Sequence, residues 1–183
     1  MNIWIIILVV YIILILITPK KYKWYLPTIP VYPNNEKEVI LVKQAIKNQN
    51  KSDLDFYNLT DSSVAHAFAK MVPENQEQLR AMSTKFHVKF TILFFKYLIN
   101  RQRPIQIDPS LNVDKSNTSN TPSYPAGHAF QAYYLAKILG KKYPYLQQQL
   151  DNLAYQCDIT RVKAGLHFPS DGQFSKTLVD TFF

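Results

Sequence analysis

The chain has 183 residues, of which 47% are hydrophobic and 19% charged, and its formal net charge is +8. This composition excludes a disordered polypeptide, and a single cysteine excludes an internal disulfide and a cysteine-based metal site. The positive charge favours anionic partners, but without an RNA-binding signature or a long Lys/Arg run, nucleic acid is not expected among them. Only 4 glycines are present and hairpin signals are lacking, which favours helices over short strands.

The N-terminal segment differs from the rest of the chain. Residues 3–17 contain neither a charge nor a helix breaker, and with their flanks they reach about 17–18 residues, the lower limit for a membrane span. No small-residue cleavage site follows, so residues 1–24 are interpreted as an uncleaved, single-pass membrane anchor with its basic flank. Lys20, Lys21 and Lys23 favour the cytoplasmic side for the following domain. An apolar tail buried in a partner is the alternative interpretation.

Residues 25–35 predict an extended tether, because three prolines and an Asn-Asn pair disfavour a helix there. Residues 36–183 then form one domain, in which apolar residues recur mainly with helical spacing. Thr60 or Asp61 can cap one helix, and Gly140 can end another. The predicted helices span residues 36–48, 61–71, 74–100, 126–139, 144–164 and 169–183, with a polar break at 50–55 and a loop at 108–121 that covers a site. The expected fold class is therefore an all-α helical bundle.

Lys96 and Arg103 form the first of three clusters that carry chemistry. They are seven residues apart, which on a continuous helix would point both the same way, and Pro104 would end that helix. Arginine offers phosphate a planar fork, whereas lysine offers a point charge. A solvated basic helix end is the alternative. Lys96 argues against it, since it interrupts an apolar run in which an unpaired cation is costly.

The second cluster is the sequence Tyr-Pro-Ala-Gly-His at residues 124–128, which begins a helix. Gly127 allows an anion to approach the backbone, and free N–H groups at a helix N-terminus favour negative charge. His128 in the first turn can donate a proton to a leaving oxygen. Taken alone, His128 is more simply interpreted as an ordinary polar residue at a helix start.

The third cluster contains Arg161, His167 and Asp171. A spacing of four makes His167 and Asp171 neighbours on one helical turn. An aspartate bonded to one imidazole nitrogen fixes the tautomer and leaves the other nitrogen free to attack. A surface His–Asp pair without function is the alternative, although Gly165 and Pro169 control the backbone around His167. His66 is expected to pack in the core and Cys157 to be a buried thiol. No function is assigned to these two residues or to His87, Asp55, Asp61 and Glu74.

Together the clusters resemble the three motifs of the type 2 phosphatidic acid phosphatase (PAP2) superfamily: Lys-x6-Arg-Pro, Pro-Ser-Gly-His and Ser-Arg-x5-His-x3-Asp. This superfamily includes bacterial acid phosphatases, lipid phosphate phosphatases and vanadium haloperoxidases. The resemblance covers about residues 56–183, and residues 56–61 are similar to soluble acid phosphatases of the group. It implies the helical bundle of the acid phosphatase/haloperoxidase type and a phosphatase that uses neither a metal nor another cofactor.

The resemblance also implies a role for each matching residue. His167 would form a phosphohistidine, Asp171 would orient it, and His128 would act as general acid and then as general base. The positions implied to bind phosphate are Lys96, Arg103, Arg161, Gly127 and Ala126.

Two positions depart from the motifs. Ala126 replaces a serine whose hydroxyl would contact phosphate, a loss of about 1.5–3 kcal/mol, unless Ser123 compensates. Thr160 also replaces a serine but keeps the hydroxyl. The substitution at 126 therefore predicts a weaker or slower site and not an inactive one.

The expected function is a membrane-anchored phosphomonoesterase acting on phosphate esters, with lipid phosphates or diphosphates among the candidate substrates. A vanadium-dependent haloperoxidase is one alternative, disfavoured by the short chain. The other is a catalytically silent anion- or lipid-binding protein, for which Ala126 is the only support. Glycosylation sequons at Asn50, Asn58 and Asn117 leave the side of the membrane open. Neither the natural substrate nor the oligomeric state is predicted.

Overall fold

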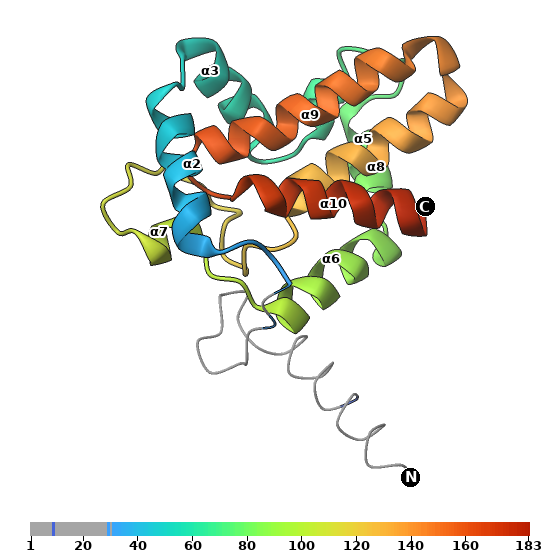
Figure 1. Cartoon of the computed structure of the whole chain (residues 1–183). Helices are drawn as coiled ribbons and strands as arrows, with labels where there is room; N and C mark the ends of the chain where they lie inside the picture. The colour runs from blue at the N-terminus through green and yellow to red at the C-terminus, as the bar shows by residue number, and fades with distance from the viewer. Residues whose placement is uncertain (1–8, 10–28, 30) are drawn as a thin grey trace.

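A computed structural model of the chain describes residues 9, 29 and 31–183 (Figure 1). The predicted anchor at residues 3–17, apart from Val9, and residues 25–28 and 30 of the tether lie outside the described residues. Of the tether predicted at residues 25–35, residues 31–34 are non-helical, whereas Asn35 already belongs to the first described helix of the domain. No helix in the described part of the chain is long and apolar enough to cross a membrane.

The domain is all-helical, and residues 31–183 contain no strand. This agrees with the fold class that the sequence predicts. In chain order the elements are α2 (Asn35–Lys47), α3 (Lys51–Thr60), α4 (Ala65–Phe68), α5 (Gln76–Ser83), α6 (Phe86–Ile99), α7 (Pro104–Ile107), α8 (Gly127–Lys142), the 3-10 turn η1 (Pro144–Leu146), α9 (Gln147–Lys163) and α10 (Pro169–Phe182).

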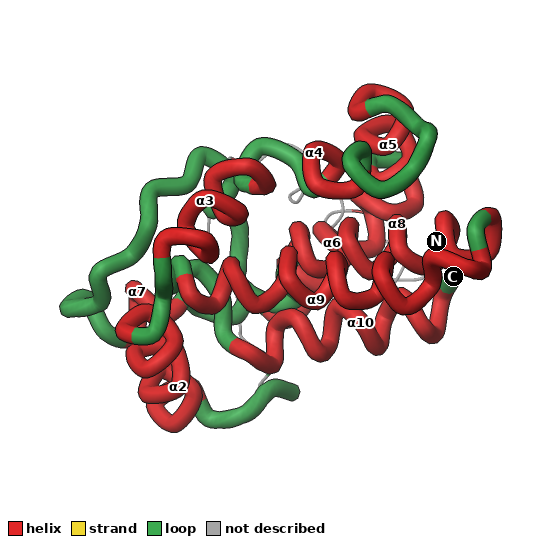
Figure 2. The backbone as a smooth tube through the Cα atoms, turned by 90° about the horizontal axis from the view of Figure 1, so that it is seen from above, coloured by secondary structure: helices red, strands yellow, loops and turns green. Residues whose placement is uncertain are grey.

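Three long helices, α8, α9 and α10, form the centre of the bundle. The turn η1 joins α8 to α9, and both of these helices pack against α10 (Figures 1 and 2). One apolar cluster joins α4 and α5 to α8 and α9, and a second joins α6 to α8 and α10. A third joins α2 to the end of α9 and the start of α10. The amide of Asp114, in the loop before α8, donates to the carbonyl of Ala164 at 3.0 Å, so this loop lies against the C-terminal end of α9.

Two predicted boundaries in the first half of the domain are wrong. The polar residues at 50–55 begin a helix, because Asn50 and Asp53 cap the first turn of α3 reciprocally. Thr60 and Asp61, predicted to cap the start of a helix, lie at the end of α3, and the helix predicted over 61–71 is confined to α4. Polar side chains here act as caps and not as a break.

The single helix predicted over 74–100 is two helices, α5 and α6. At the end of α5, the hydroxyls of Ser83 and Thr84 donate hydrogen bonds to the carbonyl of Arg80, at 3.2 and 2.7 Å. Lys85 then takes an extended ψ of 151° before α6 begins. Such local side-chain bonds to the backbone compete with continuation of a helix.

Gly140 does not end its helix, because α8 continues to Lys142. A Cβ at position 140 would lie 1.7 Å from Oε1 of Gln147 on α9. The glycine therefore leaves room for the end of the Gln147 side chain. The last two predictions are confirmed: η1 with α9 occupies 144–163, and α10 begins at Pro169.

Candidate active site

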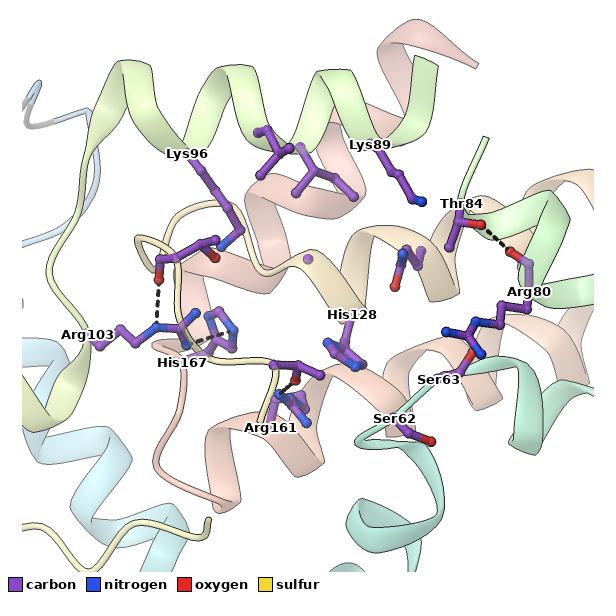
Figure 3. A pocket seen from close by; sticks show the side chains of 16 residues that line it. Ser62, Ser63, Arg80, Thr84, Lys89, Lys96, Arg103, His128, Arg161 and His167 are labelled. Carbon is purple, nitrogen blue, oxygen red and sulfur yellow. Dashed lines mark hydrogen bonds between the residues drawn. The ribbon is translucent and has the colours of Figure 1, made fainter. Parts of the chain in front are cut away.

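A cavity of about 410 Å³ lies where α6, α8 and the end of α9 converge (Figure 3). Thr118 and Thr121 of the predicted covering loop also line it. Six of the eight predicted site residues line this cavity: Lys96, Arg103, Gly127, His128, Arg161 and His167. The other two, Ala126 and Asp171, are completely buried and are not among the lining residues.

Lys96 extends from α6 into the cavity and is almost completely buried. Its ammonium donates to the backbone carbonyl of Pro122 and, at 3.4 Å, to that of Ser123. Burial, with the positive charge of Arg103, lowers the pKa of Lys96 well below its usual value. An anion in the cavity would therefore stabilise the charged form of Lys96.

Lys96 and Arg103 do not share one helix, contrary to the prediction. Chain direction changes at Asn100, which has a left-handed backbone with φ of 51°, a conformation that asparagine tolerates better than most residues. Arg103 lies in an extended segment just before α7. The two cations reach one cavity through this turn and not through helical periodicity.

The guanidinium of Arg103 is fixed by backbone oxygens. Nε donates to the carbonyl of Thr121 at 2.8 Å, and Nη1 donates to that of Leu166 at 2.9 Å. Nη1 also lies 3.3 Å from Nε2 of His167. Burial lowers the pKa of Arg103 to about 10, so Arg103 remains charged at neutral pH beside the imidazole.

His167 and Asp171 are in contact but are not on one helical turn, because His167 precedes the start of α10. Nδ1 of His167 lies 3.0 Å from Oδ2 of Asp171, which also accepts a hydrogen bond from the amide of Phe168 at 2.9 Å. Burial alone would raise the pKa of Asp171, but the bond from His167 and the charge of Arg101 bring it to about 2. The carboxylate is therefore ionised and fixes the imidazole.

The imidazole of His167 is neutral in this setting. Burial, and then the charge of Arg103, lower the pKa of His167 well below its usual value. Because ionised Asp171 accepts from Nδ1, the proton is on Nδ1, and the lone pair is on Nε2, on the side of Arg103. An imidazole nitrogen that carries no proton can act as a nucleophile, and the Nε2 lone pair that would do so faces Nη1 of Arg103.

Arg101 is a buried part of the site that the sequence does not indicate. Its Nη1 donates to Oδ1 of Asp171 and to the hydroxyl of Ser170, both at 2.7 Å, and its Nη2 lies 2.6 Å from Oε2 of Glu38. The guanidinium also stacks over the ring of Phe168 at 3.9 Å. No local pattern marks these partners, because Glu38 is 63 residues away along the chain.

Ser123 does not replace the hydroxyl that Ala126 lacks. Its own hydroxyl donates to Oδ2 of Asp171 and lies 3.3 Å from Nδ1 of His167, on the side of the imidazole away from Nε2. Ala126 bonds through its backbone: its amide donates to the carbonyl of Asp171 at 3.1 Å, and its carbonyl accepts from Ser175 at 2.9 Å. Position 126 thus connects α8 to α10.

The N-terminus of α8 is open toward the cavity. Ala126 at its N-cap has no side-chain acceptor for the first amides of the helix, which have no partners within it. Gly127 faces the cavity, since a Cβ there would lie 3.8 Å from Cε of Lys96. The amides and the helix dipole therefore add to the positive potential at this point.

His128 and Arg161 are both held by Asp61, a residue to which the sequence assigns no role. Nε2 of His128 donates to the Asp61 carbonyl at 2.9 Å, and Nη1 of Arg161 lies 2.5 Å from its carboxylate. Nη2 of Arg161 also contacts the Thr118 hydroxyl, at 3.1 Å. Burial, and then the charge of Arg161, lower the pKa of His128 to about 3, so His128 is neutral in the absence of an anion.

Positive charge in the cavity therefore comes from side chains and backbone amides. Within the described part of the chain, no three His, Cys, Asp or Glu residues are grouped in a way that could hold a metal ion. The cavity has the features needed to bind a tetrahedral anion between Nε2 of His167 and the imidazole of His128.

Comparisons with known proteins place this site on a recognised fold. The chain matches no family model and no curated protein. Among solved structures it is similar to a transmembrane PAP2-type phosphatidylglycerolphosphate phosphatase from Bacillus subtilis, with a TM-score of 0.54 and 16% sequence identity over 96% of this chain and 89% of that chain. The chain therefore has the helical fold of a PAP2-type phosphatase.

Proposed function

We propose that the protein is a phosphatase that hydrolyses phosphomonoesters through a phosphohistidine at His167. The observation that carries this proposal is the environment of Nε2 of His167. Nε2 of His167 is unprotonated, and its imidazole is held through Nδ1 by ionised Asp171. The cavity around it contains Lys96, Arg103 and Arg161 and an uncapped helix N-terminus. The fold shared with a PAP2-type phosphatase supports the same conclusion.

The first step is binding of the phosphate dianion. Lys96, Arg103 and Arg161 neutralise its equatorial oxygens, and the amides at the start of α8 add further donors. The negative charge also raises the pKa of His128, so that its imidazole takes up a proton as the substrate binds. Binding thus produces the acid that the next step needs.

Transfer of the phosphoryl group follows. The lone pair of Nε2 of His167 forms a bond to phosphorus as the bond from phosphorus to the alcohol oxygen breaks. Protonated His128 gives its proton to that oxygen, and the alcohol leaves. Asp171 stabilises the positive charge that forms on the phosphorylated imidazole.

Hydrolysis reverses these roles. Neutral His128 accepts a proton from water as the water oxygen bonds to phosphorus, and the bond from phosphorus to Nε2 of His167 breaks. Phosphate is released and His167 returns to its neutral form. All protons are thereby accounted for by His128 and the water.

The test uses the full chain purified in mild detergent with p-nitrophenyl phosphate. We expect turnover, and a loss of about 10³-fold or more in His167→Ala. Acid-labile phosphate should be trapped on wild-type protein but not on His167→Ala. His87→Gln, an exposed histidine that does not line the cavity, is the matched control. A folded chain with no turnover on several phosphoesters would overturn the proposal and favour the catalytically silent alternative.

We further propose that the enzyme acts at a membrane, with lipid phosphates among its substrates. The apolar sequence of residues 3–17 and the lipid phosphate named for the Bacillus subtilis protein support this. Lys20, Lys21 and Lys23 favour a cytoplasmic domain. Extraction of cell membranes with alkaline carbonate should leave the chain in the pellet, and protease added to sealed right-side-out cells should not cleave it. Release into the supernatant would contradict the anchor.

A further inference from the structure

The cavity continues beyond the groups used in catalysis. Arg80 of α5 and Lys89 of α6 line its outer end, together with Thr84. Figure 3 shows both cations on the side of His128 opposite to Arg103 and His167. Both residues are exposed, and neither side chain has an acidic partner among the described residues. Two cations without a counter-charge at the mouth of an anion site indicate room for more negative charge.

The spacing of Lys89 and Lys96 on α6 indicates how far apart two anionic groups of one ligand would be if each bound one of these lysines. Lys89 and Lys96 are seven residues apart within one helix, so they share a face and are separated by about 10 Å along its axis. Ile92 lies on the same face between them and also lines the cavity. An extended chain spans ~10 Å with about nine covalent bonds, at ~3.5 Å for every three backbone bonds. Because the stem of exposed Lys89 can lean toward buried Lys96, a shorter link of about six bonds also fits.

The direction of the reaction determines which part of a substrate reaches this end. In an in-line transfer, the leaving oxygen is opposite to Nε2 of His167, where His128 can protonate it. Figure 3 shows His128 between His167 and the outer cations. The alcohol that leaves therefore extends from His128 toward Arg80 and Lys89, over Ile92.

We propose that Arg80 and Lys89 bind a second anionic group on the leaving alcohol. The substrate class is a phosphomonoester whose alcohol carries a phosphate or carboxylate about six to nine bonds from the ester phosphorus, joined by a short spacer that is apolar where it passes Ile92. This inference rests on the proposed function and adds substrate specificity to it. A diphosphate does not fit, because a single oxygen separates its phosphorus atoms.

The experiment compares butane-1,4-diol bisphosphate with butane-1,4-diol monophosphate, and measures phosphate release by the full chain in mild detergent. The test variant is Arg80→Ala/Lys89→Ala. The matched control is Lys47→Ala/Lys51→Ala, which removes the same charge at two exposed lysines that do not line the cavity. The measured quantity is the ratio of kcat/KM for the bisphosphate to kcat/KM for the monophosphate.

We expect wild-type protein and the Lys47/Lys51 control to prefer the bisphosphate by about tenfold, since each exposed ion pair contributes about threefold. The Arg80/Lys89 variant should lose this preference, and raising the salt concentration should reduce it in the wild-type protein. Hydrolysis of inorganic diphosphate should depend little on Arg80 and Lys89. An equal preference in wild type and the Arg80/Lys89 variant, or no preference in wild type, would overturn the proposal.

Failure of the subsite is distinguishable from failure of the phosphatase. Turnover of p-nitrophenyl phosphate without a bisphosphate preference would overturn only the subsite. If no substrate turns over, calorimetric binding of the two butanediol compounds still tests the subsite: about tenfold tighter binding of the bisphosphate, lost in Arg80→Ala/Lys89→Ala, supports it, and equal affinities overturn it.

A second source of negative charge is a neighbouring anionic lipid. Vesicles containing phosphatidic acid, with and without phosphatidylglycerol, test this source. If Arg80 and Lys89 matter only when phosphatidylglycerol is present, and the soluble bisphosphate shows no preference, these cations contact a lipid surface and the proposal of a second group on the same molecule is wrong.

Discussion

At the scale of single residues, Asp61 contacts two groups that a substrate would also contact. Its carboxylate lies 2.5 Å from Nη1 of Arg161, and its backbone carbonyl accepts a hydrogen bond from Nε2 of His128. Asp61 stays ionised, because the bonds from Arg161 and Ser116 outweigh burial, which by itself raises its pKa; the net shift is downward. A phosphate that binds Arg161 must therefore compete with this carboxylate.

The substitution Asp61→Asn removes that competing charge and keeps the backbone carbonyl. We expect inorganic phosphate to inhibit the variant about fivefold more strongly, the size of one partly exposed ion pair. The inhibition constant of phosphate against p-nitrophenyl phosphate measures the effect. Asp114→Asn, a charge change in the loop away from the cavity lining, is the control. Weaker inhibition in Asp61→Asn would show instead that Asp61 positions Arg161.

At the scale of elements, Arg101 joins three parts of the chain. From the segment between α6 and α7, its guanidinium reaches Glu38 of α2 and Asp171 of α10, and its side chain has no exposed surface. The amide of Ser170 also donates to Glu38, at 3.1 Å. The carboxylate that orients His167 is therefore held by contacts between elements as well as by its own helix.

Removing one member of such a buried group leaves the others unpaired. We expect Arg101→Met to lower the free energy of unfolding by about 3–5 kcal/mol. It should also lower kcat, because Asp171 loses one of the interactions that lower its pKa, the others being with His167 and Ser123. Urea denaturation and the pH dependence of kcat measure the two effects. Lys43→Met, which removes an exposed ion pair from α2, should change both very little. Full stability in Arg101→Met would contradict a structural role for the ion pairs.

At the scale of the whole molecule, the three central helices enclose a carboxylate at Asp158. Its Oδ2 accepts from the hydroxyl of Tyr133 on α8 at 3.0 Å, and a Cβ at Gly172 on α10 would lie 2.0 Å from its oxygens. Burial raises the pKa of Asp158 to about 7, although the bond from Tyr133 opposes the shift. The contact between α8, α9 and α10 thus contains an aspartate whose pKa is raised toward neutral pH.

The raised pKa of Asp158 makes the stability of the folded state depend on pH. Between pH 3.8, the ordinary pKa, and about pH 7, the folded state binds a proton that the unfolded state has released, so this group makes stability fall as pH rises. Asp158→Asn cannot ionise. The free energy of unfolding of the variant minus that of the wild type should be about 1–1.5 kcal/mol larger at pH 8 than at pH 6, because only the wild type loses stability over this range. Urea denaturation at both pH values measures this, with exposed Asp151→Asn as control; a difference independent of pH would contradict the raised pKa.

The sequence-based predictions succeed where an element depends on interactions between neighbouring residues, and they fail where it depends on single hydrogen bonds or on tertiary contacts. The helix over 144–164 and the one from Pro169 are predicted because their proline starts and apolar spacing are local signals. The break at Thr84 and the cap at Asn50 depend on single hydrogen bonds that periodicity does not reveal. The prediction that Gly140 ends a helix is wrong. The glycine lies against the side chain of Gln147 on the next helix, and a local pattern does not reveal such a tertiary contact.

The helical class and the three clusters can be predicted from local patterns, because helical periodicity, helix-end residues and motif spacing are properties of neighbouring residues. The contact of Asp61 with Arg161 across 100 residues, and the contacts of Arg101 with Glu38 and Asp171, appear only in the folded chain. The tertiary structure also turns Ser123 toward Asp171, and it adds Arg80 and Lys89 to the same cavity. Such contacts arise from packing, and packing brings together side chains that have no relation along the chain.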